Sequence, residues 1–178
     1  MGGAGAGGEA IGRIGPIPRI YPTPHATCKP APLRFHGHMS FTLHPRLAAG
    51  SHDFGTELGC RILLKDNALF PWFILVPEVE EGIEDLHQLE PDAYGDVMIL
   101  VRLVSEFVSG HFKPEKLNVA CIGNQVRQMH IHIVGRSPSD PAWPGVVWGF
   151  EGKQPYTEEQ VEKIQDAFDE ALGAEEDE

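Results

Sequence analysis

Polar and apolar residues alternate in the segment Gln128-Met129-His130-Ile131-His132-Ile133-Val134. Its polar side chains, those of Gln128, His130 and His132, all carry nitrogen atoms. Alternate side chains of a β-strand point to opposite faces, so Gln128, His130 and His132 are expected to project together from one face. A neutral imidazole is a competent nucleophile towards phosphorus, because its pKa lies near neutrality and a hydrogen bond can hold one tautomer. The segment is therefore compatible with chemistry on a phosphate group, with a neighbouring side chain holding the phosphoryl oxygens.

The same spacing also fits two other interpretations. Histidine is common at surface positions, so the pair could be ordinary exposed polar residues. A His-x-His strand can also supply two zinc ligands, and His36 and His38 form a second pair of this kind. Because no complete set of zinc ligands can be assigned, we predict neither a metal nor another cofactor.

An α+β domain with an antiparallel sheet is expected to position this segment. The turn at Asp66 and Asn67 separates two apolar runs and predicts a β-hairpin that closes at Pro77. Gly123 and Asn124 suit a tight reversal between antiparallel strands, the second of which carries the histidines. The predicted strands cover residues 60–64, 72–76, 117–122 and 126–134.

Two amphipathic helices are expected beside these strands. Apolar residues recur at steps of three and four from 93 to 108, which predicts a main helix that ends near Gly110. Thr157 and Gln160 have the spacing of a capping box and predict a C-terminal helix over residues 157–172.

The folded domain is predicted at residues 37–156, followed by that helix, with a tail at either end. Residues 1–36 combine a Gly/Ala tract with many prolines, which favours disorder, and residues 173–178 form an acidic tail. The basic residues of the first tail leave targeting to an organelle open. The absence of serine and the many prolines in this tail disfavour a transit peptide.

Composition limits the classes of function. A chain of 178 residues, 42% of them hydrophobic, is expected to form one core. No apolar run approaches the roughly 20 residues that span a bilayer, and the three unpaired cysteines fit a reducing, cytoplasmic location. A net charge of −12 disfavours extended contact with nucleic acid. A single nucleotide remains a suitable partner.

The segment Gly123–Arg136 resembles the signature strand and approach loop of the histidine triad (HIT) family. The similarity runs from about Phe41 to Trp148 and includes the loop Asp140-Pro141-Ala142-Trp143-Pro144. This pattern is most similar to the bacterial HIT-like branch with Gln-x-His-x-His. The resemblance implies a HIT-like α+β fold, with about five antiparallel strands, a main helix packed on the sheet and a C-terminal helix.

The resemblance implies a nucleotide hydrolase or nucleotidyl transferase. Such an enzyme acts at the α-phosphate of a nucleoside phosphoramidate or a dinucleoside polyphosphate. His130 matches the histidine that attacks phosphorus and forms a nucleotidyl-histidine intermediate, which water or another acceptor resolves. His132 matches the last histidine, which contacts the phosphate in the transition state.

The resemblance also assigns the binding residues and a partner. Asn124 and Gln125 fall in the loop that contacts the phosphate. Asp66 or Asn67 is the counterpart of the residue that binds the ribose hydroxyls, and the choice between them stays open. Family members commonly form homodimers through the main helix and the adjacent sheet edge, so a homodimer is implied here.

Two positions depart from the family pattern. Gln128 replaces the first histidine and cannot carry a proton, and Trp72 replaces a further histidine. Loss of general acid assistance costs about 10²- to 10⁴-fold in rate, which favours a substrate with a good leaving group. The alternative is a non-catalytic nucleotide-binding or sensor module.

Arg136 is a further candidate for neutralising phosphate, while Trp143 and Trp148 could stack on a base or anchor their loop.

Overall fold

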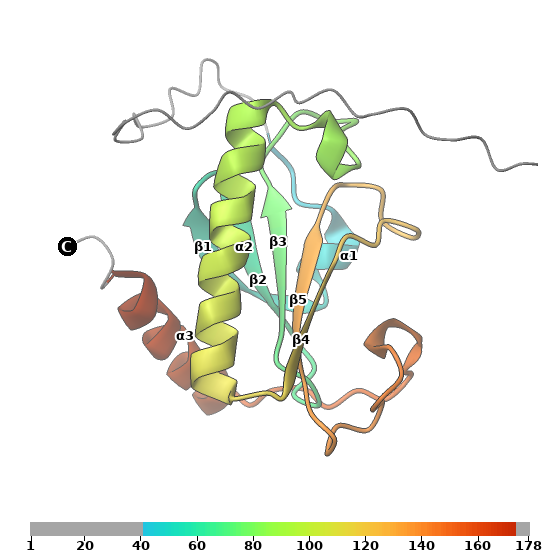
Figure 1. The fold of residues 1–178 in the computed structure, drawn as a ribbon, viewed down its shortest axis with the longest axis vertical. Helices are drawn as coiled ribbons and strands as arrows, with labels where there is room; N and C mark the ends of the chain where they lie inside the picture. Colours follow the sequence, from blue (N-terminus) through green and yellow to red (C-terminus); the bar gives the residue numbers. More distant parts are fainter. Residues whose placement is uncertain (1–40, 174–178) are drawn as a thin grey trace, which may run out of the picture. The chain divides into compact units, whose positions relative to one another are not determined.

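The computed structural model describes residues 41–173 of the chain. The predicted N-terminal tail, with His36 and His38, lies outside these residues, as do the last five residues of the acidic tail. Five antiparallel strands form one sheet in the order β1-β2-β3-β5-β4 (Figure 1). Their bounds are Ser51–Glu57 for β1, Cys60–Lys65 for β2, Trp72–Pro77 for β3, Lys116–Ala120 for β4 and Ile131–Arg136 for β5.

Two helices, α2 (Pro91–Phe112) and α3 (Glu158–Gly173), pack against one face of this sheet. In Figure 1, α2 runs along the strands and crosses in front of the sheet. The rings of Phe73, Phe107 and Phe168 meet in this core, with Phe73 and Phe168 stacked at a centroid distance of 5.6 Å. Both predicted helices and the fold class are confirmed. Neither these helices nor the shorter ones within residues 41–173 have the length and apolar character to cross a bilayer.

The opposite face of the sheet carries a second, smaller core. Leu63, Trp72 and Val134 point to this face, where Leu47 of the short helix α1 (Pro45–Ala48) and Val147 cover them. All residues of β3 are therefore buried, which explains why its sequence is continuously apolar rather than alternating. This face is therefore covered by a short helix and loops instead of long helices.

The capping box of α3 is confirmed. The Gln160 amide N–H donates to Thr157 Oγ1 at 3.2 Å, and the Thr157 amide N–H donates to Gln160 Oε1 at 2.9 Å. These two bonds satisfy donors at the start of the helix that have no partner within it.

The strand predicted over residues 126–134 was wrong in its bounds, since β5 begins only at Ile131. Residues 121–130 form an irregular connection instead of a tight reversal at Gly123 and Asn124. Its backbone is held from outside the sheet, because the Met129 amide N–H donates to Ile83 O at 3.3 Å. β1 and α1 were not predicted from the sequence.

Candidate functional site

His130 directly precedes β5 and His132 is its second residue, and both side chains lie on the face opposite α2. Their neighbours Met129, Ile131 and Ile133 point into the core beneath α2, so the predicted alternation of side chains is confirmed on that side. The two imidazole rings lie edge to face with a centroid distance of 4.8 Å. The two side chains are only 5% and 6% exposed, so the pair is not ordinary polar surface.

His130 is held in the tautomer that a nucleophile needs. Its Nδ1 lies 2.7 Å from Gln128 O, and a carbonyl oxygen can only accept a hydrogen bond. Nδ1 therefore carries the proton, and the lone pair remains on Nε2. Burial lowers the pKa of His130 and outweighs the hydrogen bond to the Gln128 carbonyl, which raises it. The charge of His44 lowers the pKa of His130 by a smaller amount. His130 is therefore neutral at neutral pH.

His132 is held in the opposite tautomer. The Trp72 indole N–H donates to His132 Nδ1 at 3.0 Å, so the proton of neutral His132 lies on Nε2. Burial, His130 and Lys65 together lower the pKa of His132 to about 3. His132 is therefore a neutral donor of a hydrogen bond. Trp72, noted in the sequence as a departure from the family pattern, has a direct role in setting this state.

The side chain of Gln128 is directed to the segment before α1. Gln128 Oε1 accepts from the His44 backbone N–H at 2.9 Å, and Gln128 Nε2 donates to Thr42 O at 3.0 Å. Both ends of the amide therefore have a backbone partner. In this structure Gln128 fixes the backbone next to the histidine pair.

The loop before β5 borders a cavity of about 700 Å³. Gln125, Gln128 and His44 contribute to its wall, together with the loop of residues 79–84. Gln125 Oε1 accepts from Arg46 Nη2 at 2.8 Å, while Asn124 is exposed. Neither His130 nor His132 lines this cavity, although their neighbours Gln128 and Met129 do.

Asp66 and Asn67, the predicted ribose-binding residues, follow β2 and hold the segment that leads to α3. Asp66 accepts from the Tyr156 backbone N–H at 3.0 Å and pairs with Lys153 Nζ at 3.1 Å. Asn67 accepts from the Gln154 backbone N–H at 3.0 Å and is only 7% exposed. Both side chains therefore have structural partners, and their role in binding ribose stays a prediction.

Arg136 does not have the phosphate-binding arrangement that was considered for it. Its guanidinium is buried and donates twice to Asp140, at 2.8 and 3.0 Å, and once to Asn118 Oδ1 at 3.0 Å. This ion pair fixes the loop that carries Trp143 and Trp148. The Trp148 ring reaches the site and lies 5.7 Å from the His132 ring, between centroids.

Lys65 lies beside the site and was not predicted from the sequence. It lies two residues after Leu63 in β2 and therefore points to the same face as Trp72 and the histidines. Its Nζ lies 5.9 Å from the centroid of the Trp72 ring. Alternation along β2 predicts which face Lys65 points to. It identifies Lys65 only when the pairing of β2, β3 and β5 is also known.

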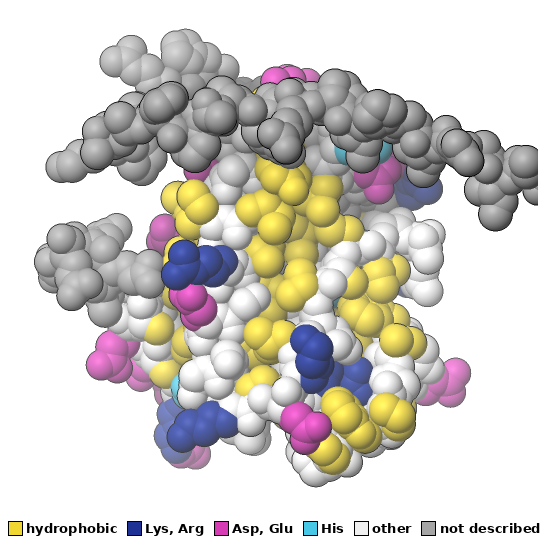
Figure 2. All heavy atoms as spheres, in the orientation of Figure 1, with side chains coloured by type: hydrophobic (Ala, Val, Ile, Leu, Met, Phe, Trp, Pro, Cys, Tyr) yellow, Lys and Arg dark blue, Asp and Glu magenta, His cyan; other side chains and the backbone are white. Residues whose placement is uncertain are grey.

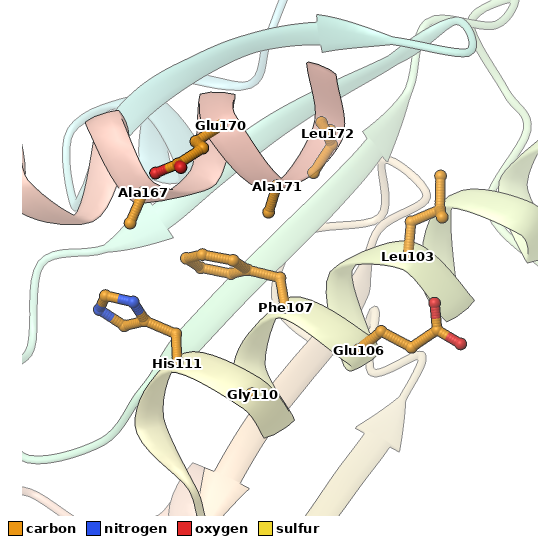
Figure 3. A pocket seen from close by; sticks show the side chains of 9 residues that line it. All are labelled: Leu103, Glu106, Phe107, Gly110, His111, Ala167, Glu170, Ala171 and Leu172. Carbon is orange, nitrogen blue, oxygen red and sulfur yellow. The ribbon is translucent and has the colours of Figure 1, made fainter. Parts of the chain in front are cut away.

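Another groove lies between α2 and α3, on the far side of the sheet from the histidines. Figure 3 shows Phe107 pointing from α2 towards Ala167 and Ala171 of α3, with His111 beside it. His111 stacks on Phe107 at a centroid distance of 5.1 Å. None of the predicted site residues lines this groove. Within residues 41–173, no three His, Cys, Asp or Glu side chains cluster in a way that could hold a metal ion.

Comparisons with known proteins agree on one family. The model of the HIT domain matches residues 49–139. A crystal structure of a histidine triad protein from Sinorhizobium meliloti 1021 is 34% identical with a TM-score of 0.71, and the match covers 75% of this chain and 98% of that one. A histidine triad protein from Marinobacter aquaeolei VT8 is 39% identical with the same TM-score, covering 75% and 97%.

A more distant structure shares the fold alone. It is a hypothetical histidine triad nucleotide-binding protein from Sulfolobus tokodaii strain7, 17% identical with a TM-score of 0.53, and the match covers 70% of this chain and 85% of that one. No curated protein matches the chain.

Proposed function

Since the chain belongs to the histidine triad family, we propose that it binds a nucleotide on the histidine face and breaks a bond at its α-phosphate. The observation that carries this proposal is the pair of opposite tautomers. His130 has a free lone pair on Nε2, while His132 has a proton on Nε2, and the two rings lie 4.8 Å apart. One side chain can therefore attack phosphorus while the other donates to a phosphoryl oxygen.

The reaction proceeds by two displacements at the same phosphorus. The Nε2 lone pair of His130 forms a bond to the α-phosphorus, and the bond to the leaving group breaks with its electron pair on the leaving group. Water then attacks the same phosphorus, gives up a proton to solvent, and the electron pair of the P–N bond returns to Nε2. A nucleotide acceptor in place of water gives transfer instead of hydrolysis.

The leaving group receives no proton from Gln128, because an amide cannot act as a general acid near neutral pH. His132 is also neutral, with its pKa lowered to about 3, so it donates a hydrogen bond rather than a proton. A leaving group that departs as a stable anion suits this site best. Dinucleoside polyphosphates meet this requirement, whereas a phosphoramidate needs a proton on its amine.

A turnover screen of wild type, His130→Ala and His130→Asn tests the proposal. Diadenosine polyphosphates, adenosine phosphoramidate and AMP are the probes, and binding is followed separately by calorimetry. Wild type should release a mononucleotide, while both variants lose turnover by about 10⁴-fold or more and still bind AMP. Turnover that survives in both variants would contradict the proposed role of His130.

The second candidate function is a nucleotide sensor without chemistry. It is favoured by Gln128, whose amide is fully used in holding residues 42–44. In that case wild type and His130→Ala would bind AMP with similar affinity, and no substrate would be turned over. The same screen therefore separates the two candidates.

We also infer that the protein is a homodimer through α2 and the free edge of β4. Tyr94, Met98 and Ile99 of α2 and Val119 of β4 are apolar and exposed, at 38%, 39%, 51% and 48%. Figure 2 shows hydrophobic side chains gathered in a continuous patch over this region. β4 ends the sheet, so its unpaired backbone groups are available to a second copy.

A further inference from the structure

Trp148 closes a triangle of rings around the imidazole of His132. Its ring lies 5.7 Å from the His132 ring and 6.0 Å from the Trp72 ring, between centroids, and the Trp72 and His132 rings are 5.5 Å apart. All three pairs meet edge to face, which is a favourable arrangement for aromatic rings. Trp72 and His132 are each only 6% exposed. His132 is therefore enclosed by two tryptophans.

The segment of residues 137–150, which carries Trp148, is fastened to the sheet at two points. The first is the buried ion pair of Arg136 with Asp140, whose side chains are 2% and 6% exposed. The Asp140 carboxylate also accepts from two backbone N–H groups of this segment, at 3.1 and 2.9 Å. The second is Val147, which is buried in the smaller core. Because Trp148 directly follows Val147, these two contacts fix the position of its ring.

Trp148 contributes a ring to this cluster and no hydrogen bond. Its Nε1 is buried and has no hydrogen-bond partner within residues 41–173. The Trp72 indole differs, since its N–H donates to His132 Nδ1 at 3.0 Å. A buried donor without a partner costs free energy, which the contacts of the ring must offset. A phenylalanine in place of Trp148 would therefore keep most of what the side chain contributes.

Exclusion of water from His132 keeps this side chain neutral, with its proton on Nε2. Burial is the largest cause that lowers the pKa of His132 to about 3. The charged groups that act on the ring are His130, which precedes β5, and Lys65 of β2, and both lower the pKa further. Water at the ring would solvate the charged form and would compete with the Trp72 N–H for the single lone pair of Nδ1. Either change would remove the fixed Nε2–H donor.

We propose that Trp148 is a positioning residue, which excludes water from His132 and from its hydrogen bond with Trp72 and thereby keeps the proton of His132 on Nε2. This inference rests on the proposed reaction and deepens it, because Trp148 acts through His132 and not on the substrate. The sequence left two roles open for Trp148, stacking on a base or anchoring its loop. The ring contacts with Trp72 and His132 support this third role.

Nuclear magnetic resonance of the nucleotide-free protein tests the proposal without the need for turnover. In wild type, His132 should keep its proton on Nε2 as the pH is lowered through 6.5, the ordinary pKa of histidine, and the Trp72 indole N–H should exchange slowly with water. Trp148→Ala should raise the pKa of His132 towards 6.5 and speed the exchange of the Trp72 N–H by about 10-fold or more. Trp148→Phe should keep both close to wild type.

Trp143→Ala is the matched control. Trp143 lies on the same loop, but its ring contacts the guanidinium of Arg136 at 5.9 Å. This variant should leave the pKa of His132 and the exchange of the Trp72 N–H unchanged. Wild type alone can overturn the proposal if Trp148→Ala does not fold: His132 titrating near pH 6.5, or a Trp72 N–H that exchanges as fast as an exposed indole, would do so.

Kinetics with a diadenosine polyphosphate provide the second readout. Trp148→Ala should lower kcat by about 10²-fold, the loss expected for one donor to a transition state, and leave the affinity for AMP nearly unchanged. An equal loss of AMP affinity would assign Trp148 to nucleotide binding and overturn the proposal. Failure of the proposed reaction would appear separately, as absence of turnover in wild type, while the state of His132 is still decided by magnetic resonance.

Discussion

The chemistry of the two histidines is decided by the groups that face their Nδ1 atoms. A backbone carbonyl faces His130 at 2.7 Å and an indole N–H faces His132 at 3.0 Å, so the two rings present opposite groups at Nε2. Neither partner can be inferred from the histidine spacing. Both depend on burial, which also keeps the imidazoles neutral by lowering their pKa values.

Replacing Trp72 by phenylalanine tests this arrangement. Trp72→Phe keeps an aromatic ring but removes the donor to His132 Nδ1, so His132 is free to move its proton away from Nε2. We expect turnover to fall by about 10²-fold, the typical loss for one donor to a transition state. Trp72→His, which can restore an N–H donor, should recover part of the rate. Nitrogen chemical shifts of His132 would report the tautomer directly, and an unchanged tautomer in Trp72→Phe would contradict this explanation.

The dependence of the rate on pH gives a second test at the same scale. Attack needs neutral His130, and its pKa lies below the ordinary value of 6.5 because the ring is buried. The acid limb of kcat/KM should therefore lie below pH 6.5, with the rate falling as pH drops through the pKa of His130 and no loss between pH 6.5 and 7.5. The profile is measured in a buffer of constant ionic strength. An acid limb above pH 6.5 would contradict the assigned state of His130.

At the scale of elements, the strand of the histidines is short, and the connection before it supports the site. Gln128 and His130 precede β5, and Gln128 ties this connection to residues 42–44 through both ends of its amide. α1 follows directly and covers the histidine face with Leu47. Gln128 therefore supports the segment next to the histidine pair through both of these hydrogen bonds.

Gln128→Ala should loosen this support. It removes the partners of the Thr42 carbonyl and the His44 amide, which costs about 0.5–1.5 kcal/mol of the free energy of unfolding for the half-buried His44 bond and less for the exposed Thr42 bond. Hydrogen exchange of the amide of His44 should become faster, while His130→Ala leaves it unchanged. Gln165→Ala, which removes an exposed contact to Asp169, is the matched control and should change stability by less than about 0.5 kcal/mol. Unchanged exchange at His44 would show that Gln128 does not hold this segment.

The sequence predicted the elements whose pattern is local. The periodicity of residues 93–108 identified α2, and the capping box at Thr157 identified the start of α3. The start of β5 could not be predicted, because residues 126–130 alternate like a strand but are held by Ile83 and by the segment before α1. The start of β5 is therefore set by contacts between distant parts of the chain. Lys65 was missed for the same reason, since its importance comes from its place beside Trp72.

At the scale of the whole molecule, the histidine pair lies on one face of the sheet, and the helical side carries the exposed apolar side chains of the proposed dimer interface. The exposed apolar side chains of α2 and β4 lie on that surface (Figure 2). The site itself faces the other way, so its chemistry does not require side chains of α2. Assembly and chemistry are therefore expected to be separable by mutation.

Ile99→Glu should separate them. Ile99 is 51% exposed on α2, and a carboxylate there would be buried without a partner in the dimer. Light scattering coupled to gel filtration should give a dimer for wild type and a monomer for Ile99→Glu, with nucleotide binding retained. Leu58→Glu, at an exposed apolar position between β1 and β2, should stay dimeric. A monomeric wild type would contradict the inferred interface.

The most direct measurement of the central proposal is the mass of the intact protein after rapid acid-free quenching of a reaction with a diadenosine polyphosphate. We predict a mass increase of one nucleotidyl group, located by peptide mapping on His130, labile in acid and absent from His130→Ala. Detection of the adduct on another residue, or steady turnover of wild type without any adduct, would contradict His130 as the nucleophile.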